Sequence, residues 1–132
     1  MKILILGAGR VGSSLASTLS KQNYEVSIVD LNKDKLLSLQ EDYDLATELG
    51  HSSHPDTLER AGADQDTILL AVTNSDECNI ASCQIAKSKF NVKKTICRLS
   101  DSSYLGSLEA FGEKNIDIAI GPRMRLQNIL LI

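Results

Sequence analysis

The hydrophobic positions of this chain alternate between two periods. Residues 2–6, KILIL, contain four consecutive apolar residues, which is typical of a buried strand. Val11, Leu15 and Leu19 follow at intervals of four residues, as on one face of a helix. The same alternation continues along the chain. It predicts strands at residues 2–6, 25–30, 44–49, 66–72, 95–99 and 116–120.

Helices are predicted between these strands. Pro55 and Pro122 each stand where a helix would begin, because proline fits the first helical turn. No repeat, linker or low-complexity tract interrupts the series, so residues 1–121 form one predicted domain and residues 122–132 begin a further helix. After the helix that contains Val11, the predicted helices cover residues 33–41, 55–60, 76–89, 103–113 and 122–132.

Strands that alternate with helices form a parallel sheet with right-handed crossovers. Six strands with a glycine-rich loop after the first predict a Rossmann-type, doubly wound α/β fold with the strand order 3-2-1-4-5-6. In such a sheet the ligand cleft lies beyond the carboxyl ends of the first and fourth strands. The glycine-rich loop stands at this position.

Composition agrees with one globular domain and excludes several classes of function. The 132 residues are 42% hydrophobic and 23% charged, and their net charge of −3 provides no basic surface for nucleic acid. No apolar run approaches the ~18 residues of a membrane span. The cysteines, Cys78, Cys83 and Cys97, are odd in number and lack CxxC spacing, which predicts reduced thiols in a cytoplasmic protein.

The loop GAGRVG, residues 7–12, follows a predicted strand and opens a predicted helix. In this position Gly7 allows a tight turn, Gly9 lets a pyrophosphate approach the backbone, and Gly12 lets helix and strand pack closely. The unpaired N–H groups and the dipole of the helix start favour the phosphate charge. Because glycines also serve ordinary turns, other residues must support a nucleotide site.

Asp30 gives that support, because it ends the second strand 23 residues after Gly7. A carboxylate there can accept both ribose hydroxyls of an adenosine. It would repel a 2′-phosphate, and the neighbouring Leu31 offers no guanidinium for one, so NAD or NADH is favoured over NADP(H). Lys33 leaves that choice open, and ATP or ADP would fit the same site. The alternative role of Asp30 is to cap the next helix, which Asn32 could do equally well.

Several stretches of the chain resemble one family. GAGRVG, VDLNKDKL, GHSSHPDTLERAGADQDTILLAVTNSDECNIASCQIAK and ICRLSDSSY are similar to the N-terminal nucleotide-binding domain of the TrkA potassium-uptake regulators, also called the RCK or KTN domain. The resemblance covers nearly the whole chain and departs from the family at residues 121–123. It implies a cytosolic ring of such domains that gates a potassium channel or transporter.

The resemblance also implies a set of ligand contacts. The phosphates would lie at the glycine loop, the ribose at Asp30 and the adenine at His51. The ends of the fourth and fifth strands would complete the set. The predicted site residues are Gly7, Ala8, Gly9, Arg10, Val11, Gly12, Asp30, Leu31, His51, Thr73, Asn74 and Arg98.

Some of these residues have alternative explanations. Arg10 could be a solvated residue of the first helical turn, and Arg98 could be an exposed residue of an edge strand. Asn74 could cap the helix that follows it. His51 and His54 lie three residues apart, as metal ligands can, but no further His or Cys stands nearby, so no metal site is predicted.

No catalytic residues are predicted. The six strands and their connections use the chain to about residue 120, which leaves no room for a substrate domain, and no Tyr-xxx-Lys pair occurs. The two histidines lie on the predicted adenine side of the cleft. A domain that binds a nucleotide without transforming it is most simply a sensor.

A sensor needs a partner. The apolar residues of the segment 122–132 predict a helix that docks on a second copy, and the alternative is that it packs on its own sheet. We therefore expect a cytoplasmic regulatory subunit, a dimer or ring held at the inner face of the membrane by a potassium channel or transporter. It would change conformation when it binds NAD, NADH or an adenine nucleotide. The alternative function is the detached NAD-binding domain of an oxidoreductase.

Overall fold

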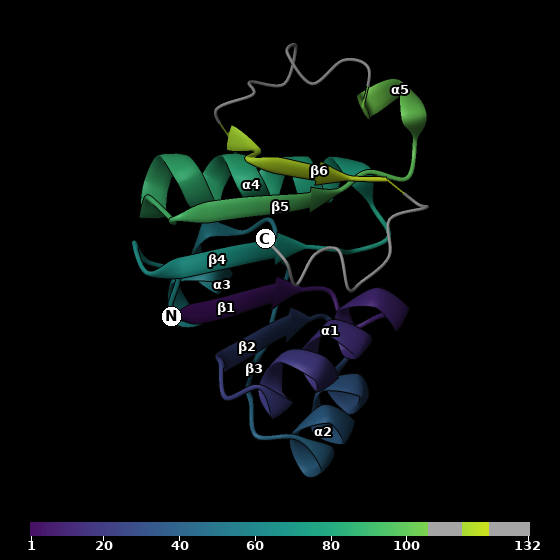
Figure 1. Cartoon of the computed structure of the whole chain (residues 1–132), viewed down its shortest axis with the longest axis vertical. Helices are drawn as coiled ribbons and strands as arrows, with labels where there is room; N and C mark the ends of the chain where they lie inside the picture. Colours follow the sequence, from purple (N-terminus) through teal and green to yellow (C-terminus); the bar gives the residue numbers. More distant parts are fainter. Residues whose placement is uncertain (106–114, 122–132) are drawn as a thin grey trace.

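The computed structural model describes residues 1–105 and 115–121. They form a parallel sheet with the strand order β3-β2-β1-β4-β5-β6 (Figure 1). The predicted Rossmann-type fold is therefore confirmed. The strands are β1 (Lys2–Leu6), β2 (Glu25–Asp30), β3 (Ala46–Leu49), β4 (Thr67–Ala71), β5 (Lys94–Arg98) and β6 (Ile118–Ile120).

Helices connect consecutive strands, as predicted. The predicted helix at residues 103–113 corresponds to α5 as far as Leu105; its remainder lies outside the described residues, as does the predicted helix at 122–132. Within residues 1–105 and 115–121, no helix has the length and apolar content needed to cross a bilayer. The helices are α1 (Arg10–Lys21), α2 (Lys33–Asp42), α3 (Pro55–Arg60), α4 (Asp76–Phe90) and α5 (Ser102–Leu105).

The sheet separates two hydrophobic cores. Along β1, Ile3 and Ile5 pack in the core with α1 and α2, whereas Leu4 and Leu6 pack in the core with α3 and α4. Successive side chains of a strand point to opposite faces, so β1 is buried on both sides. The helices that begin at the carboxyl ends of the strands are thus fixed against the sheet, and so are the loops that precede them.

Two strands, β3 and β6, begin two residues later than the sequence predicted. Ala46 is the first residue of β3 in register with β2, because the preceding Leu45 N–H bonds locally to the Tyr43 carbonyl oxygen at 3.1 Å. Asp117, directly before β6, bonds to β5 through its side chain. Its Oδ2 accepts the Thr95 backbone N–H at 2.8 Å, so the regular strand begins only at residue 118.

Candidate functional site

A cavity of about 720 Å³ opens beyond the carboxyl ends of β1 to β5. These five strands are neighbours in the sheet. At ~4.8 Å between strands, the cavity extends about 19 Å across the sheet. We call it the cleft. One half lies over β2 and β3, the other over β4 and β5, and the glycine loop after β1 lies between them.

Most of the predicted site residues meet in this cleft. Ala8 and Gly12 are the exceptions: both are buried, and neither lines the cavity. The structure thus brings together residues from five separate loops. The predicted residues that line the cleft are Gly7, Gly9, Arg10, Val11, Asp30, Leu31, His51, Thr73, Asn74 and Arg98.

The three glycines of the loop differ in the space that a side chain would have. Gly7 has a φ of +106°, and a Cβ there would come within 3.0 Å of the Thr73 Cα. A Cβ on Gly12 would collide with the carbonyl oxygen of Gly7, so only glycine lets α1 start this close to β1. A Cβ on Gly9 would meet nothing within 4 Å. The fold therefore needs Gly7 and Gly12, whereas Gly9 borders open space at the N-terminus of α1, where an anion is favoured.

Both oxygens of the Asp30 carboxylate are held by backbone N–H groups. Oδ2 accepts the N–H of Ala8 at 2.7 Å, and Oδ1 accepts the N–H of Asn32 at 2.8 Å. The cap of α2 is Asn32, whose Oδ1 accepts the Lys35 N–H at 3.1 Å. Asp30 is thus not the helix cap. Because each carboxylate oxygen can accept more than one hydrogen bond, Asp30 can still receive two hydroxyl groups from the cleft.

The β3 side of the cleft ends at His51, whose imidazole stacks on that of His54. The rings of His51 and His54 lie 4.5 Å apart between centroids, with 18° between their planes. His51 Nδ1 accepts the Ser53 backbone N–H at 3.2 Å, so the neutral ring carries its proton on Nε2. Among the described residues, no three His, Cys, Asp or Glu side chains come together as metal ligands do. His51 therefore offers the cleft an aromatic ring, backed by that of His54, and an Nε2–H donor.

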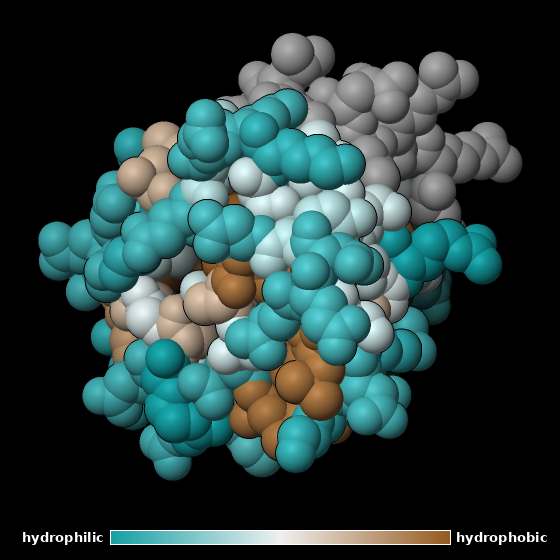
Figure 2. All heavy atoms as spheres, turned by 90° about the horizontal axis from the view of Figure 1, so that it is seen from below, coloured by the Kyte–Doolittle hydropathy of each residue, from teal (hydrophilic) through white to brown (hydrophobic). Residues whose placement is uncertain are grey.

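Exposed leucines lie near the same half of the cleft. The surface at the α2 end of the molecule is mostly hydrophilic but is interrupted by apolar side chains (Figure 2). Leu31, which lines the cleft, is 67% exposed, and Leu49 at the end of β3 is 49% exposed. The β2–β3 half therefore combines an oriented carboxylate with apolar and aromatic surfaces, which suits a nucleoside.

The β4–β5 half is built on a buried amide. Asn79, in the second turn of α4, is fully buried. Its Oδ1 accepts the Thr73 hydroxyl at 2.6 Å, and its Nδ2 donates to the Arg98 carbonyl oxygen at 2.9 Å. The Arg98 guanidinium donates in turn to the Thr73 carbonyl oxygen at 3.3 Å. The predicted cap role of Asn74 falls to Ser75, whose hydroxyl oxygen accepts the Cys78 N–H.

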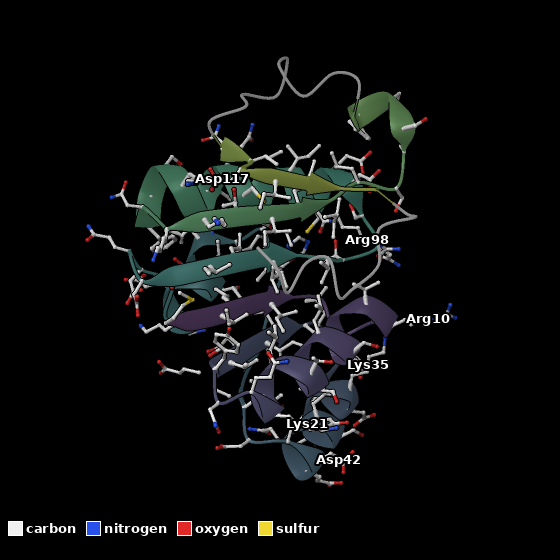
Figure 3. All side chains as sticks on the ribbon, viewed as in Figure 1. Arg10, Lys21, Lys35, Asp42, Arg98 and Asp117 are labelled. Carbon is white, nitrogen blue, oxygen red and sulfur yellow. The ribbon has the colours of Figure 1, made fainter. Side chains whose placement is uncertain are left out.

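The cleft carries positive charge. Arg10 at the start of α1, Lys35 in α2 and Arg98 at the end of β5 all line it (Figure 3). Within the described part of the chain, none of these three side chains forms an ion pair. Among the described lining residues, Asp30 is the sole carboxylate. The charges of the lining favour an anionic ligand.

Comparison with known proteins identifies the family. The family model described as the TrkA-N domain matches residues 3–122. The chain belongs to the TrkA-N domain family. Two relatives are named Trk system potassium uptake protein TrkA: that of Vibrio alginolyticus is 46% identical over 92% of this chain, and that of Azorhizobium caulinodans is 36% identical over 99%. The chain spans 27% of the length of the first and 30% of the second.

Solved structures share the fold of this TrkA-N domain. The NAD(P)-binding domain of an exopolyphosphatase-related protein from Archaeoglobus fulgidus has a TM-score of 0.79 at 17% identity and covers 98% of this chain and 93% of its own. The GsuK channel bound to NAD has a TM-score of 0.71 at 20% identity, over 90% of this chain and 21% of its own. The Kef C-terminal domain of Shewanella denitrificans in its AMP-bound form has a TM-score of 0.72 at 20% identity, over 99% and 76%.

Sequence reasoning missed several residues of the TrkA-N cleft. Lys35 lines it, whereas Lys33, the lysine that the sequence singled out, does not. Cys78, which the sequence marked only as a reduced thiol, also lines the cleft, with its Sγ 3.0 Å from the Ser52 Oγ. The position of Ser52, directly after His51, was a signal for its place in the cleft. No pattern in the sequence singled out Cys78 or Lys35.

The other cysteines of the TrkA-N domain lie away from the cleft. Cys83 and Cys97 are fully buried between α4 and β5, and all three cysteines are free thiols. A hydrogen bond with Cys97 and burial raise the pKa of the Cys83 thiol well above its usual value. Cys83 therefore stays protonated at neutral pH and acts as an apolar core residue.

Proposed function

We propose that this TrkA-N domain senses NAD or NADH, or ATP or ADP at the same site, as a regulatory subunit of a bacterial potassium uptake system. The nucleotide would lie across the cleft, with its adenosine over β2 and β3 and its phosphates at the glycine loop. The second half of a dinucleotide would lie over β4 and β5. Binding would shift the conformation of an assembly that gates a membrane potassium channel or transporter.

The orientation of Asp30 is the observation that carries this proposal. The Ala8 and Asn32 N–H groups hold the carboxylate beside the glycine loop. Each carboxylate oxygen accepts one of these N–H groups and keeps a lone pair that can accept a hydroxyl group. A carboxylate at the cleft together with open space at Gly9 suits an adenosine ribose joined to a phosphate. The Arg10 and Arg98 side chains, which line the cleft, would neutralise part of the phosphate charge.

The regulatory role draws on the relatives. Those of Vibrio alginolyticus and Azorhizobium caulinodans are potassium uptake proteins by name, and the GsuK channel has been seen with NAD. A nucleotide can move a gate only if it binds one conformation of the assembly more tightly than another. We propose that this chain works as a homo-oligomer, a dimer or a ring, on the cytoplasmic side of its membrane partner.

The domain would bind its nucleotide without transforming it. The Asp30 carboxylate lies in the half of the cleft that would take the adenosine, and His51 Nδ1 accepts the Ser53 N–H. His51 also lies at the β3 end of the cleft, away from the half where a nicotinamide would lie. Neither group is arranged to move a proton at the nicotinamide.

Calorimetric titration of the 132-residue chain with NADH, NAD, ATP and ADP tests the proposal. At least one of the four should bind at one site per chain, and all that bind should compete with each other. Chromatography after incubation should recover each nucleotide unchanged. Conversion of NADH to NAD when a hydride acceptor is added would favour an oxidoreductase instead. Sedimentation should show a dimer or larger species, and a monomer at micromolar concentration would contradict the oligomer.

A further inference from the structure

We propose that Asn79 is a positioning residue of the cleft, which fixes the end of β5 against the loop after β4 and so shapes the half that takes the non-adenosine part of a dinucleotide. This inference rests on the proposed function. It concerns one residue that does not itself line the cleft but holds two residues that do, Thr73 and Arg98.

The carboxamide of Asn79 bonds to both loops at once. Its Oδ1 accepts the backbone N–H of Thr73 at 3.0 Å and the Thr73 hydroxyl at 2.6 Å. Its Nδ2 donates to the carbonyl oxygen of Thr73 at 3.1 Å and to that of Arg98 at 2.9 Å. Both donors and the acceptor of the amide are therefore used, in a side chain that is fully buried.

Asparagine suits this set of bonds better than aspartate or leucine would. Aspartate would offer acceptors only and would face two carbonyl oxygens, and leucine would leave the Thr73 N–H without its partner. Asn79 is also not the cap of α4, because that cap is Ser75. Asp76, in the first turn of α4, accepts the N–H groups of Ser100 and Asp101. The amide is thus dedicated to the two loops.

The bonds of Asn79 determine where the Arg98 side chain begins. β5 and α4 pack side by side, and Arg98 lies at the end of β5 (Figures 1 and 3). Asn79 holds the Arg98 backbone, and the Arg98 guanidinium bonds to the Thr73 carbonyl oxygen that Asn79 also holds. Without the amide, the hydrogen bonds that fix the distance between Thr73 and Arg98 are lost, and these two residues no longer hold their positions in the β4–β5 half of the cleft.

Other bonds hold the polar groups of the β2–β3 half. Asp30 is held by Ala8 and Asn32, and His51 by Ser53. AMP would occupy this half and the glycine loop, whereas NADH would fill both halves. A change at Asn79 should therefore weaken NADH binding and spare AMP, a distinction that general loss of stability would not produce.

Titration of three variants with NADH and with AMP tests the inference. Asn79→Asp keeps the size of the side chain but loses both donors, and Asn79→Ser is the smaller alternative. The matched control is Thr95→Val, because Thr95 is also fully buried but lies at the other end of β5, where its hydroxyl donates to the Asn115 carbonyl oxygen. The unfolding temperature of each variant is measured first without ligand, and the titrations are run at a temperature at which all variants are folded.

Both Asn79 variants should raise the Kd for NADH at least tenfold and the Kd for AMP less than threefold. Thr95→Val should lower the unfolding temperature and leave both Kd values unchanged. An unchanged Kd for NADH, equal loss of NADH and AMP, or failure of both Asn79 variants to fold would overturn the inference. If the unaltered chain binds neither NADH nor AMP, the proposed function fails first; binding that the Asn79 variants retain defeats only this inference.

Discussion

The Asp30 carboxylate accepts the backbone N–H of Ala8 at 2.7 Å, which joins the end of β2 to the glycine loop after β1. The group that would hold a ribose is therefore built into the loop that would hold the phosphates. A ligand that contains a ribose and a phosphate, as an adenosine phosphate does, would therefore contact two groups that are joined by a hydrogen bond. This relationship leads to predictions for the ligand and for the loop.

NADPH should bind at least tenfold more weakly than NADH, roughly 1.4 kcal/mol. The 2′-phosphate would lie against the Asp30 carboxylate, and Lys35 in the exposed first turn of α2 would screen only part of the repulsion. Competition between the two ligands on the 132-residue chain measures the difference. Equal affinity would mean that Asp30 does not face the ribose.

Substitution of two glycines should separate binding from folding. Gly9→Val places its side chain in open space, so it should abolish NADH binding and lower the unfolding free energy by no more than about 1 kcal/mol, the usual range for a helix cap position. Gly12→Ala would collide with the Gly7 carbonyl oxygen and should destabilise the fold far more. Calorimetry and urea unfolding of both variants check this. A Gly9→Val variant as unstable as Gly12→Ala would contradict the open position of Gly9.

A bound nucleotide should protect one thiol. Cys78 lines the cleft and is partly exposed, whereas Cys83 and Cys97 are fully buried. A chromogenic thiol reagent should therefore react rapidly with one thiol per folded chain, and saturating NADH should slow that reaction. Cys78→Ser should remove the rapid phase. A rapid phase that NADH leaves unchanged would place the ligand elsewhere.

Asp117 should stabilise the fold at neutral pH but not in acid. Burial raises the pKa of Asp117, but hydrogen bonds from Lys87 and the Thr95 N–H lower it by more, so that the pKa lies below the usual 3.8. A carboxylate with a lowered pKa stabilises the folded state above its unfolded pKa and loses that effect as the pH falls through the folded value. The Lys87–Asp117 ion pair is 2.7 Å long and partly exposed, so Asp117→Asn should cost about 1 kcal/mol or less at pH 7.

Denaturant unfolding from pH 7 to pH 3 measures this. The difference in unfolding free energy between the unaltered chain and Asp117→Asn should narrow below about pH 3.8, the usual pKa of the group. If the difference in unfolding free energy instead increases in acid, the pKa of Asp117 is raised in the folded state and not lowered.

The fold was predictable from sequence because its signals are local. The apolar run of β4, the helix cap at Asn32 and the glycine loop each lie within a few consecutive residues. The alternation of strands and helices then restricts the order of the strands. The starts of β3 and β6 were less predictable, because they depend on two particular bonds: that of the Leu45 N–H to the Tyr43 carbonyl oxygen before β3, and that of the Thr95 N–H to the Asp117 side chain before β6.

The framework of the cleft was not predictable in the same way. In the stretch TNSDECN, Ser, Asp and Asn all fit helix caps, and the sequence cannot show that Asp76 bonds to Ser100 or that Asn79 bonds to Arg98. These partners are about twenty residues away and meet only when β4 and β5 pair. Lys35 and Cys78 face the cleft because of the direction of α2 and the start of α4, which periodicity alone does not fix.

The central claim is that Asp30 holds the ribose of an adenine nucleotide. The most direct measurement is calorimetric titration of the unaltered chain, Asp30→Ala and Asn32→Ala with NADH. Asn32→Ala removes the cap of α2 but keeps the backbone N–H that binds Asp30. Asp30→Ala should weaken binding by about 1.5–3 kcal/mol, as expected for hydrogen bonds to a charged group, and Asn32→Ala should leave the Kd unchanged. A folded Asp30→Ala chain that binds NADH as tightly as the unaltered chain would contradict the claim.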